Sequence, residues 1–588
     1  MSSTADFLIP IPASPAEAAP HSWDDLKSYY DRLAELPLTR DNVESWLATW
    51  SWLEAVMSET ASLAMIAYTC DTADPGKQAT HLRWSAEIMP RAEEESVRLA
   101  RRLVDSGLEP PGLETTVRRF RTAIGLFRQE SVPLFTELEE LGAEYQRITG
   151  SMMADWEGRR VPLPQLAPFL ERPERDTRER AFRAGTEPYV ASRNELADLF
   201  QRMYVLRQQV AVNAGFANFR DYIFPAKFRF DYTPADCERF QDAVERSVVP
   251  AIRRLNAERR TRLGLETLRP WDLQLNPYRP DSFRPYDNPV DLPRIALRMF
   301  ERVDAALGAQ FRTLLVEGGL DLESRKGKAP GGYCDTLHVR GRPFIFMNAS
   351  GVMDDVTTLL HEAGHAFHAF AAHRLPYIWQ RHPGAEAAEL ASMSMELLAG
   401  AHLARPVGFL APGDAQRARL ERLEETLLSL AHIASVDAFQ HWIYASGEGG
   451  DTEARNAAWL RIRDRFEPDV DWDGLDRERV ARWYRQLHLF LYPFYYIEYG
   501  IAQLGALQVW RNSLRDPAAA LAGYRSFLGL GATRPLPQLY AAAGAELIFD
   551  AEGMTALVAL VEDQAAALRA TLLREVAPSG ATGEIGRD

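Results

Sequence analysis

The 588-residue chain contains little cysteine and no long apolar run. Its three cysteines, Cys70, Cys237 and Cys334, are widely spaced, which argues against a disulfide framework and a CxxC zinc site and favours a reducing compartment. No apolar run of about eighteen residues occurs, so we expect no transmembrane helix. The N-terminal stretch lacks the basic and apolar segments of a secretory signal. We therefore predict a cytoplasmic protein that makes no use of a membrane.

The chain also lacks an excess of basic residues. Its net charge is -15 and its pI about 5.4, which argues against a nucleic-acid partner and against docking on anionic lipid. With 46% hydrophobic and 25% charged residues, the composition is that of a globular protein able to bury a large core. Peptides and small molecules remain as ligand classes.

Most of the sequence has the 3.6-residue periodicity of amphipathic helices. One apolar stripe begins at Val43 and includes Trp46 and Trp50. A helix near 234–263 has a well-defined start, with Thr233 as N-cap, Pro234 next and Asp236 three residues after the cap. Further helices are expected over 86–105, 114–146, 174–213, 291–316 and most of 386–575.

Non-helical segments separate these helices. A Pro-rich, Asn-rich and aromatic stretch over 264–290 predicts a long ordered loop. The basic residues 326–328 are expected to form a solvated turn. Two short apolar runs on either side of Arg340-Gly341-Arg342 predict a β-hairpin over 336–348. The expected fold class is therefore mainly α with a small sheet.

One predicted helix carries an unusual set of polar residues. In TTLLHEAGHAFHAF, Thr357–Phe370, three histidines and a glutamate interrupt an apolar pattern. At about 100° per residue, His365 falls roughly 40° from His361 and His368 roughly 20° to its other side, so the three share one stripe. Glu362 lies beside this stripe. Asp354 or Asp355 is expected to cap the helix.

This spacing suits a zinc ion. Imidazoles one turn apart, at His361 and His365, can both reach a tetrahedral Zn²⁺ at about 2.0–2.1 Å. Glu362 is not placed as a third ligand and can instead accept a proton from the water that the metal activates. The pattern also arises by chance, so a helix with satisfied structural histidines is the competing interpretation.

A third ligand must lie further along the chain, because position 371 is Ala and the metzincin extension HExxHxxGxxH is absent. A second apolar helix, beginning after Gly384, carries Glu386, Glu389 and Glu396 near one face. Carboxylates on such a helix need a partner. Glu386 is close to the turn, and geometry alone leaves Glu389 and Glu396 open.

The segments HEAGHAFH and ELASMSME together resemble the oligoendopeptidase F / thimet oligopeptidase family of zinc metallopeptidases. The resemblance implies that His361, His365 and Glu389 hold one Zn²⁺ per chain. By the same match Glu396 is not a ligand but a carboxylate that hydrogen-bonds to a ligand histidine and orients it. His368 matches a recurring histidine of the motif and is expected to support the ligands from behind or to contribute packing, without binding the metal.

A second match, HLFLYPFYYIEYG over 488–500, resembles the aromatic segment of that family. It implies that Tyr492 and Tyr499 contact substrate and stabilise the transition state, and that His488 has the same role, although the spacing from His488 to Tyr492 departs from the family pattern by one residue. Donors aimed at a developing oxyanion suit amide hydrolysis. The other rings of the run are expected to form an aromatic core patch: Phe494, Tyr495 and Tyr496.

The resemblance implies two helical halves around a deep substrate channel, with the small sheet near the zinc helix. Residues 1–24 and 576–588 are small, Pro/Gly-rich and polar, so we expect them to be flexible tails. Between them we expect an N-terminal helical domain over 25–195 and a catalytic domain over 196–575. The expected activity is zinc-dependent hydrolysis of internal bonds in short peptides, with Glu362 as base. The alternatives are a carboxypeptidase or dipeptidyl carboxypeptidase on a related scaffold and a non-catalytic peptide-binding protein. The hairpin is expected to pair with an extended peptide.

Overall fold

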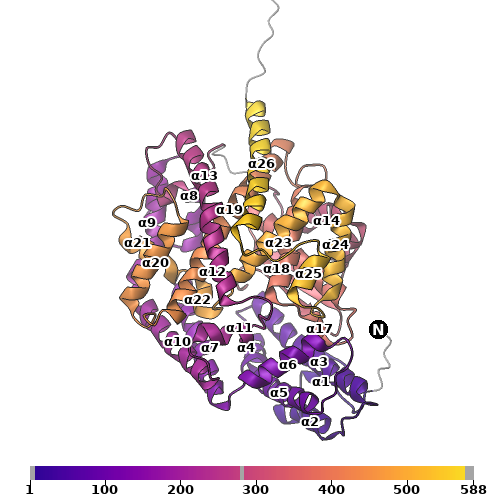
Figure 1. The fold of residues 1–588 in the computed structure, drawn as a ribbon. Helices are drawn as coiled ribbons and strands as arrows, with labels where there is room; N and C mark the ends of the chain where they lie inside the picture. Colours follow the sequence, from indigo (N-terminus) through magenta and orange to yellow (C-terminus); the bar gives the residue numbers. More distant parts are fainter. Residues whose placement is uncertain (1–6, 279–283, 577–588) are drawn as a thin grey trace, which may run out of the picture.

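The computed structural model describes residues 7–278 and 284–576, and it is dominated by helices (Figure 1). The N-terminal part contains α1 (Pro15–Ala18), α2 (Trp23–Glu35), α3 (Val43–Cys70), α4 (Pro75–Leu82), α5 (Met89–Asp105) and α6 (Glu114–Leu126). The next part contains α7 (Val132–Gly150), β1 (Met153–Trp156), β2 (Arg159–Pro162), α8 (Ala167–Leu170), α9 (Arg175–Ala191), α10 (Arg193–Asn213), α11 (Phe219–Ala226), α12 (Pro234–Ala243) and α13 (Val249–Arg262).

The remaining elements carry the candidate site. They are α14 (Asp291–Val303), α15 (Ala305–Glu317), β3 (Leu320–Glu323), β4 (Tyr333–Leu337), β5 (Arg342–Ala349), α16 (Met353–Ala372), α17 (Ile378–Arg381), α18 (Ala385–Gly400), α19 (Pro412–Ala445), α20 (Thr452–Phe466), α21 (Asp476–Tyr484), α22 (Leu487–Leu491), α23 (Tyr496–Arg515), α24 (Pro517–Leu530), α25 (Leu536–Ala542) and α26 (Ala551–Val576). No helix in the described ranges is long and apolar enough to cross a bilayer. The prediction of a mainly α fold is confirmed.

Several predicted helices are divided in the structure. The segment 114–146 forms α6 and α7, 174–213 forms α9 and α10, and 291–316 forms α14 and α15. The predicted start at Thr233 is confirmed: its hydroxyl accepts from the Asp236 N–H, and the Asp236 carboxylate accepts from the Thr233 N–H at 2.7 Å. The loop predicted over 264–290 contains one short 3₁₀ turn, Pro270–Asp272, and residues 279–283 lie outside the described part.

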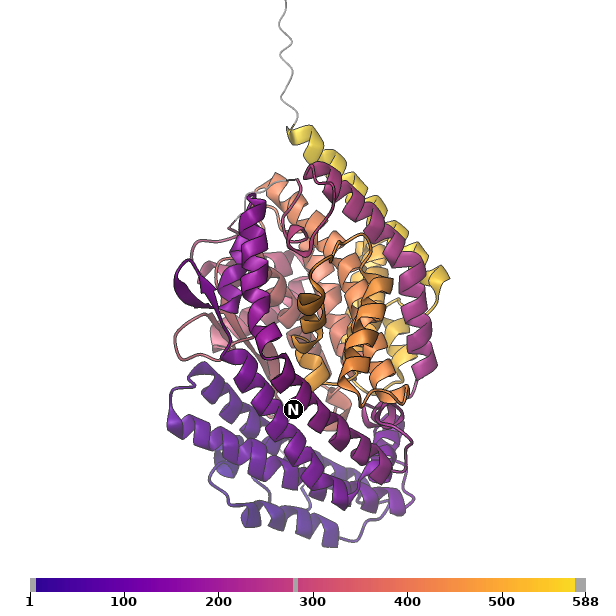
Figure 2. The same cartoon turned by 90° about the vertical axis from the view of Figure 1, so that its left-hand side faces the viewer.

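The N-terminal helices have their own hydrophobic core, which forms the lower lobe in Figures 1 and 2. It extends from Ile9 to Val117 and includes the fully buried Trp46 and Trp50. Residues 7–24 pack onto it, with Ala18 buried and the Leu8 N–H donating to Thr49 Oγ1 at 3.1 Å. The tail predicted over residues 1–24 is therefore wrong from residue 7 onward.

A second and larger core includes buried residues from Leu141 to Ala565. Residues on α7 and α10, such as Tyr145 and Phe200, belong to it. The division predicted at residue 195 falls inside this core, and we propose a division between α6 and α7 instead. In Figure 2, α13 and α26 run side by side along the edge of this part, and the Arg254–Glu562 ion pair at 2.7 Å joins them.

The three-stranded sheet has the order β3-β5-β4, with β5 parallel to β3 and antiparallel to β4. The predicted hairpin is confirmed as β4 and β5, with Tyr333 opposite Phe346 and Leu337 opposite Arg342. Because β5 is the central strand, Ile345 and Phe346 are already paired with both β3 and β4. Peptide pairing at these two residues is therefore excluded, and an added strand would have to pair with an outer edge of the sheet, at β3 or at β4.

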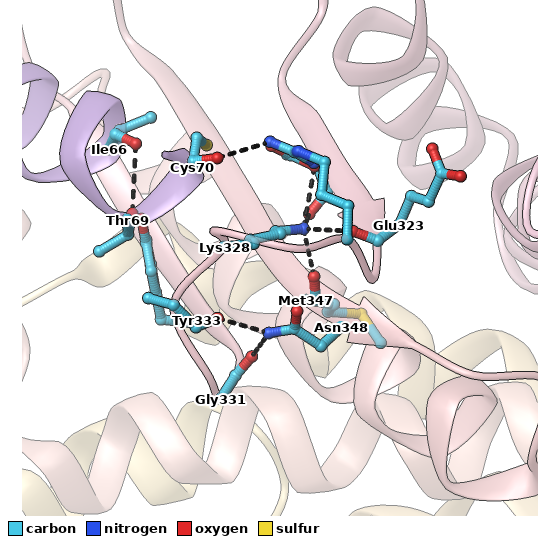
Figure 3. A network of polar contacts seen from close by, with 12 residues as sticks. Ile66, Thr69, Cys70, Glu323, Lys328, Gly331, Tyr333, Met347 and Asn348 are labelled. Atoms are coloured by element: carbon cyan, nitrogen blue, oxygen red, sulfur yellow. Dashed lines mark hydrogen bonds and ion pairs between the residues drawn. The ribbon is translucent and has the colours of Figure 1, made fainter. Parts of the chain in front are cut away.

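The predicted solvated turn at 326–328 is wrong for Lys328, whose side chain is fully buried (Figure 3). Its ammonium forms an ion pair with Asp321 at 2.9 Å and donates to the carbonyl oxygens of Glu323 and Met347. Burying a charge is costly without a partner, and here the carboxylate and strand carbonyls satisfy it. The hydroxyls of Thr69 and Tyr333, 2.7 Å apart, join α3 to the same sheet.

Candidate metal and peptide-hydrolysis site

Helix α16 begins at Met353 and is preceded by the extended residue Val352. Neither Asp354 nor Asp355 is the N-cap, so that prediction is wrong. Asp355 instead acts from the first turn, where its buried carboxylate accepts from the N–H groups of Ser350, Gly351 and Val352 at 2.9, 2.7 and 2.9 Å. A carboxylate at this end of a helix also interacts favourably with the helix dipole.

A close approach of α16 and α18 brings the predicted ligands together. The chain turns through α17 and returns as α18, and the two helices meet at Gly364. A Cβ atom at Gly364 would lie 2.5 Å from Ser392 Cα and 2.8 Å from Ala391 O, distances that real Cβ atoms do not adopt. Glycine is therefore required here by interhelical distance, and this contact sets how near Glu389 lies to the histidines.

The side chains of His361, His365 and Glu389 converge on one point. Their ligand atoms all lie within 4.8 Å of one another. Glu389 Oε2 is 3.3 Å from His361 Nε2 and 3.8 Å from His365 Nε2. Two ligands bonded to a tetrahedral Zn²⁺ at about 2.0–2.1 Å are separated by about 3.3 Å, so this set fits the ion.

The charges of these three side chains favour the binding of a cation. Burial raises the pKa of Glu389, but the His361 hydrogen bond and the charges of His365 and His361 lower it to about 2. Burial also lowers the pKa of His361, but the adjacent carboxylates outweigh it and the net shift is upward. His365 is half-buried, and burial lowers its pKa to about 4, so it is neutral at pH 7. A divalent cation would take the place of the shared proton.

Glu396 contacts the other nitrogen of His361. Its Oε1 lies 2.7 Å from His361 Nδ1, and its Oε2 forms an ion pair with Arg422 of α19. A carboxylate on the second ring nitrogen fixes the tautomer of a metal-binding histidine and turns Nε2 toward the ion. The structure thus separates Glu389 and Glu396, which face opposite nitrogens of one imidazole.

Glu362 is buried, with 8% of its surface exposed, and lies one residue after His361 on α16. Burial raises the pKa of its carboxyl to about 7, a shift that the charge of His361 opposes and the charges of Glu389 and Glu396 reinforce. A carboxyl in this range can both accept and return a proton near neutral pH. No described residue donates a hydrogen bond to it, so its oxygens are available to a ligand.

Tyr495 is the residue that the sequence interpretation misplaced. It was expected in an aromatic core patch, yet its hydroxyl donates to Glu389 Oε1 at 3.0 Å. Phe494 does belong to the core, being fully buried, and Tyr496 donates to Gln486 at 3.1 Å. The four-residue spacing of Tyr495 and Tyr499 was the available clue, since it places both rings on the same side, 5.0 Å apart.

Tyr499 packs against Tyr495, with the ring centroids 5.0 Å apart, and has no hydrogen bond to any described residue. Burial, followed by the charge of Glu389, raises the pKa of its hydroxyl above the ordinary value, so the group stays protonated. His488 packs among the tyrosine rings, 4.9 Å from Tyr496 and 5.9 Å from both Tyr492 and Tyr499. Tyr492 is 55% exposed. The structure therefore brings Tyr499 and His488 near Glu389 and leaves Tyr492 at the rim.

His368 does not join the ligand group. It is 4% exposed, its ring lies 5.3 Å from that of Phe527, and neither ring nitrogen has a hydrogen-bond partner among the described residues. Burial lowers its pKa to about 3, so it is a neutral packing residue at pH 7. A cavity of about 450 Å³ borders the site on the side of Glu396 and is lined by His361, Glu362 and Arg422 among others.

With this geometry in place, comparison with known proteins defines the class. The model of peptidase family M3 matches residues 169–558, and the chain belongs to that family. The match includes α16, α18 and α23, the three helices that carry the ligand group, Glu362 and Tyr499.

Particular relatives are oligopeptidases. The chain is 23% identical to oligopeptidase PepF of Bacillus subtilis over 62% of this chain and 53% of that protein, and 22% identical to an oligoendopeptidase F homolog of Lactococcus lactis over 51% and 49%. It therefore spans about half the length of the curated relatives it matches. A solved structure of Pz peptidase A with an inhibitor has a TM-score of 0.86 at 27% identity, covering 93% of this chain and 98% of that one.

Proposed function

We propose that the protein is a zinc-dependent oligoendopeptidase that hydrolyses internal bonds of short peptides. The observation that carries the proposal is the placement of Glu389 Oε2 3.3 Å from His361 Nε2 and 3.8 Å from His365 Nε2, with the buried carboxylate of Glu362 on the same helix as both histidines. Membership of peptidase family M3 supports the reaction class. Zinc as the metal is inferred from the donor set of two imidazoles and one carboxylate.

His361, His365 and Glu389 would hold Zn²⁺, which when bound supplies Lewis acidity toward water and the peptide carbonyl. Glu362 accepts the proton that water loses as its oxygen attacks the carbonyl carbon. It then delivers that proton to the amine nitrogen as the C–N bond breaks. Its pKa near 7 suits both transfers.

Tyr499 is the oxyanion donor in this proposal. Its hydroxyl is protonated and free of any hydrogen bond within the described residues, whereas the hydroxyl of Tyr495 is already directed at Glu389. A preorganised donor strengthens its hydrogen bond as negative charge develops on the carbonyl oxygen. His488 and Tyr492 are proposed to contact substrate, on the strength of their rings at 5.9 Å from one another beside Tyr499.

The outer edge of β4 is proposed to receive the peptide as an added strand. Strand β4 carries Cys334, whose pKa is raised by burial and by the charge of Glu362, which reflects their proximity. A peptide paired there would have its backbone fixed near the base. The two helical halves are proposed to enclose the channel that limits substrates to short peptides.

The variant Glu362→Gln tests the mechanism. It keeps the shape of the side chain and removes its basicity, so zinc content should stay at the wild-type level while peptide turnover is lost. Products from a mixed peptide library, read by mass spectrometry with and without a chelator, measure turnover. Terminally blocked peptides added to the library separate endopeptidase from exopeptidase action. Wild-type turnover by the Gln variant would overturn the role of Glu362.

A further inference from the structure

A second group of metal-binding side chain types lies between α12 and α19, which pack against each other. It consists of Cys237 on α12 and of Asp437 and His441 on α19, and their ligand atoms all lie within 4.8 Å of one another. Asp437 and His441 are one turn apart and therefore share a face of α19. None of the three belongs to the peptide-hydrolysis site.

The polar atoms of this group are buried and lack partners. Cys237 and Asp437 are 0% exposed and His441 is 5% exposed. Asp437 Oδ1 and both ring nitrogens of His441 have no hydrogen-bond partner among the described residues. Leaving a buried polar atom unpaired is unfavourable, and three such atoms meet here. Within the described ranges, His441 is also the only ion-pair partner of Asp437, at 3.5 Å.

The three donors suit zinc in type and in charge. A thiolate, a carboxylate and an imidazole are each ordinary zinc ligands. A thiolate and a carboxylate together balance the charge of Zn²⁺, so the occupied group would be neutral in a setting where the rings of Phe224 and Phe494 pack edge-on against His441. We propose that Cys237, Asp437 and His441 supply three ligands of a zinc ion that ties α12 to α19, with a buried water in the fourth position.

Neighbouring residues are placed to orient two of these ligands. Gln241 Nε2 donates to Asp437 Oδ2 at 2.7 Å, which leaves Oδ1 for the ion. Glu238 Oε1 lies 3.9 Å from His441 Nδ1, which is beyond hydrogen-bond distance, so a small side-chain movement would be needed for this carboxylate to accept the N–H and direct Nε2 inward. Ligands of a tetrahedral zinc are separated by about 3.3–3.8 Å, so small side-chain rotations from separations of at most 4.8 Å close the site.

A catalytic role for this group is excluded. The same residue types form thiol hydrolases, but Cys237 is fully buried and no substrate carbonyl could reach its sulfur. A bound water satisfying the same atoms is the competing occupant. A bound zinc ion and a bound water can be distinguished by experiment, because only the metal bonds to the thiolate.

Cobalt titration of the 588-residue protein tests the site, because Co²⁺ bonded to thiolate gives a near-ultraviolet charge-transfer band and the peptide-hydrolysis site contains no thiolate. The protein is stripped with a chelator under reducing conditions and titrated with Co²⁺, and Zn²⁺ content is measured separately by mass spectrometry. The variant C70S/C334S leaves Cys237 as the only thiol, since the chain has three cysteines. We expect two metal ions per chain and the thiolate band in this variant and in the wild type.

The variant Cys237→Ser should lose the band and one of the two ions, and His441→Asn should do the same. Glu389→Gln should lose the other ion and keep the band, so failure of the peptide-hydrolysis site and failure of this site give different results. Saturated wild-type protein without a thiolate band would overturn the proposal whatever the variants do. A band that persists in Cys237→Ser would overturn it as well.

Discussion

Gly364→Ala is expected to disturb the metal site although residue 364 carries no ligand atom. The new Cβ would lie 2.5 Å from the backbone Cα of Ser392, and ordinary contact begins at 3.4 Å, so the helices must separate by about 0.9 Å (3.4 minus 2.5). Because the obstacle is backbone, no rotamer change relieves it. Overpacking of this kind costs about 1–3 kcal/mol of stability.

The same displacement moves Glu389 away from the histidines, since Glu389 and Ser392 are on one turn of α18. Adding about 0.9 Å to the separations of 3.3 and 3.8 Å gives about 4.2 and 4.7 Å, whereas a tetrahedral zinc needs about 3.3 Å. We expect zinc affinity to fall by at least about 10–100-fold, the loss typical of a disturbed ligand environment.

Zinc affinity by chelator competition and the midpoint of thermal unfolding measure the two effects. Gly529→Ala on α24 is the matched control, because a Cβ there meets nothing within 4 Å. It should leave zinc binding unchanged and stability unchanged or raised by about 0.4–1 kcal/mol. Zinc affinity in Gly364→Ala equal to that of Gly529→Ala would refute the idea that this helix contact positions Glu389.

Three other predictions address single residues. Glu389→Gln should lose zinc while Glu386→Gln keeps it, because Glu386 accepts from Tyr232 at 2.6 Å instead of facing the histidines; equal zinc content in both, by mass spectrometry, would contradict this. Tyr499→Phe should lower kcat by about 10²–10³-fold with zinc content unchanged, and an unchanged kcat would remove Tyr499 from the mechanism. His338 is 4% exposed, and burial lowers its pKa to about 2. Between about pH 2 and about pH 6.5 only the unfolded state therefore binds a proton at this residue, so the free energy of unfolding falls as the pH decreases, by about 1.4 kcal/mol per pH unit. His338→Gln should therefore take up nearly one proton fewer than the wild type on urea unfolding at about pH 5, and equal uptake would show that the histidine is not buried neutral.

The local sequence was sufficient to predict the features that depend on a single helix or hairpin. The four-residue spacing of His361 and His365 places both imidazoles on one side of α16, and the Thr233 capping box starts α12 where it was predicted. The pairing of β4 with β5 likewise follows from the two apolar runs and their short turn. These features depend on the backbone period and on contacts a few residues apart.

The periodicity of the sequence could not predict contacts between elements that are far apart in the chain. Residue spacing left Glu389 and Glu396 as equal candidates for the third metal ligand, and the family resemblance selected Glu389. Only the packing of the helices places one carboxylate on each ring nitrogen of His361. From the sequence, Tyr495 is expected in the core and Lys328 in a solvated turn. The packing of α23 on α18 instead directs Tyr495 at Glu389, and β3 and β5 enclose Lys328.

The sequence by itself therefore determined which residue types sit on each helix face and which family the motifs resemble. The tertiary structure alone decided which faces meet, and so which polar atoms find partners. The physical reason is that interhelical distance depends on a few contacts such as Gly364 against Ser392, and a change of about 1 Å there decides whether a ligand set can close. The meeting of Cys237 with Asp437 and His441, two hundred residues apart in the chain, is of the same kind.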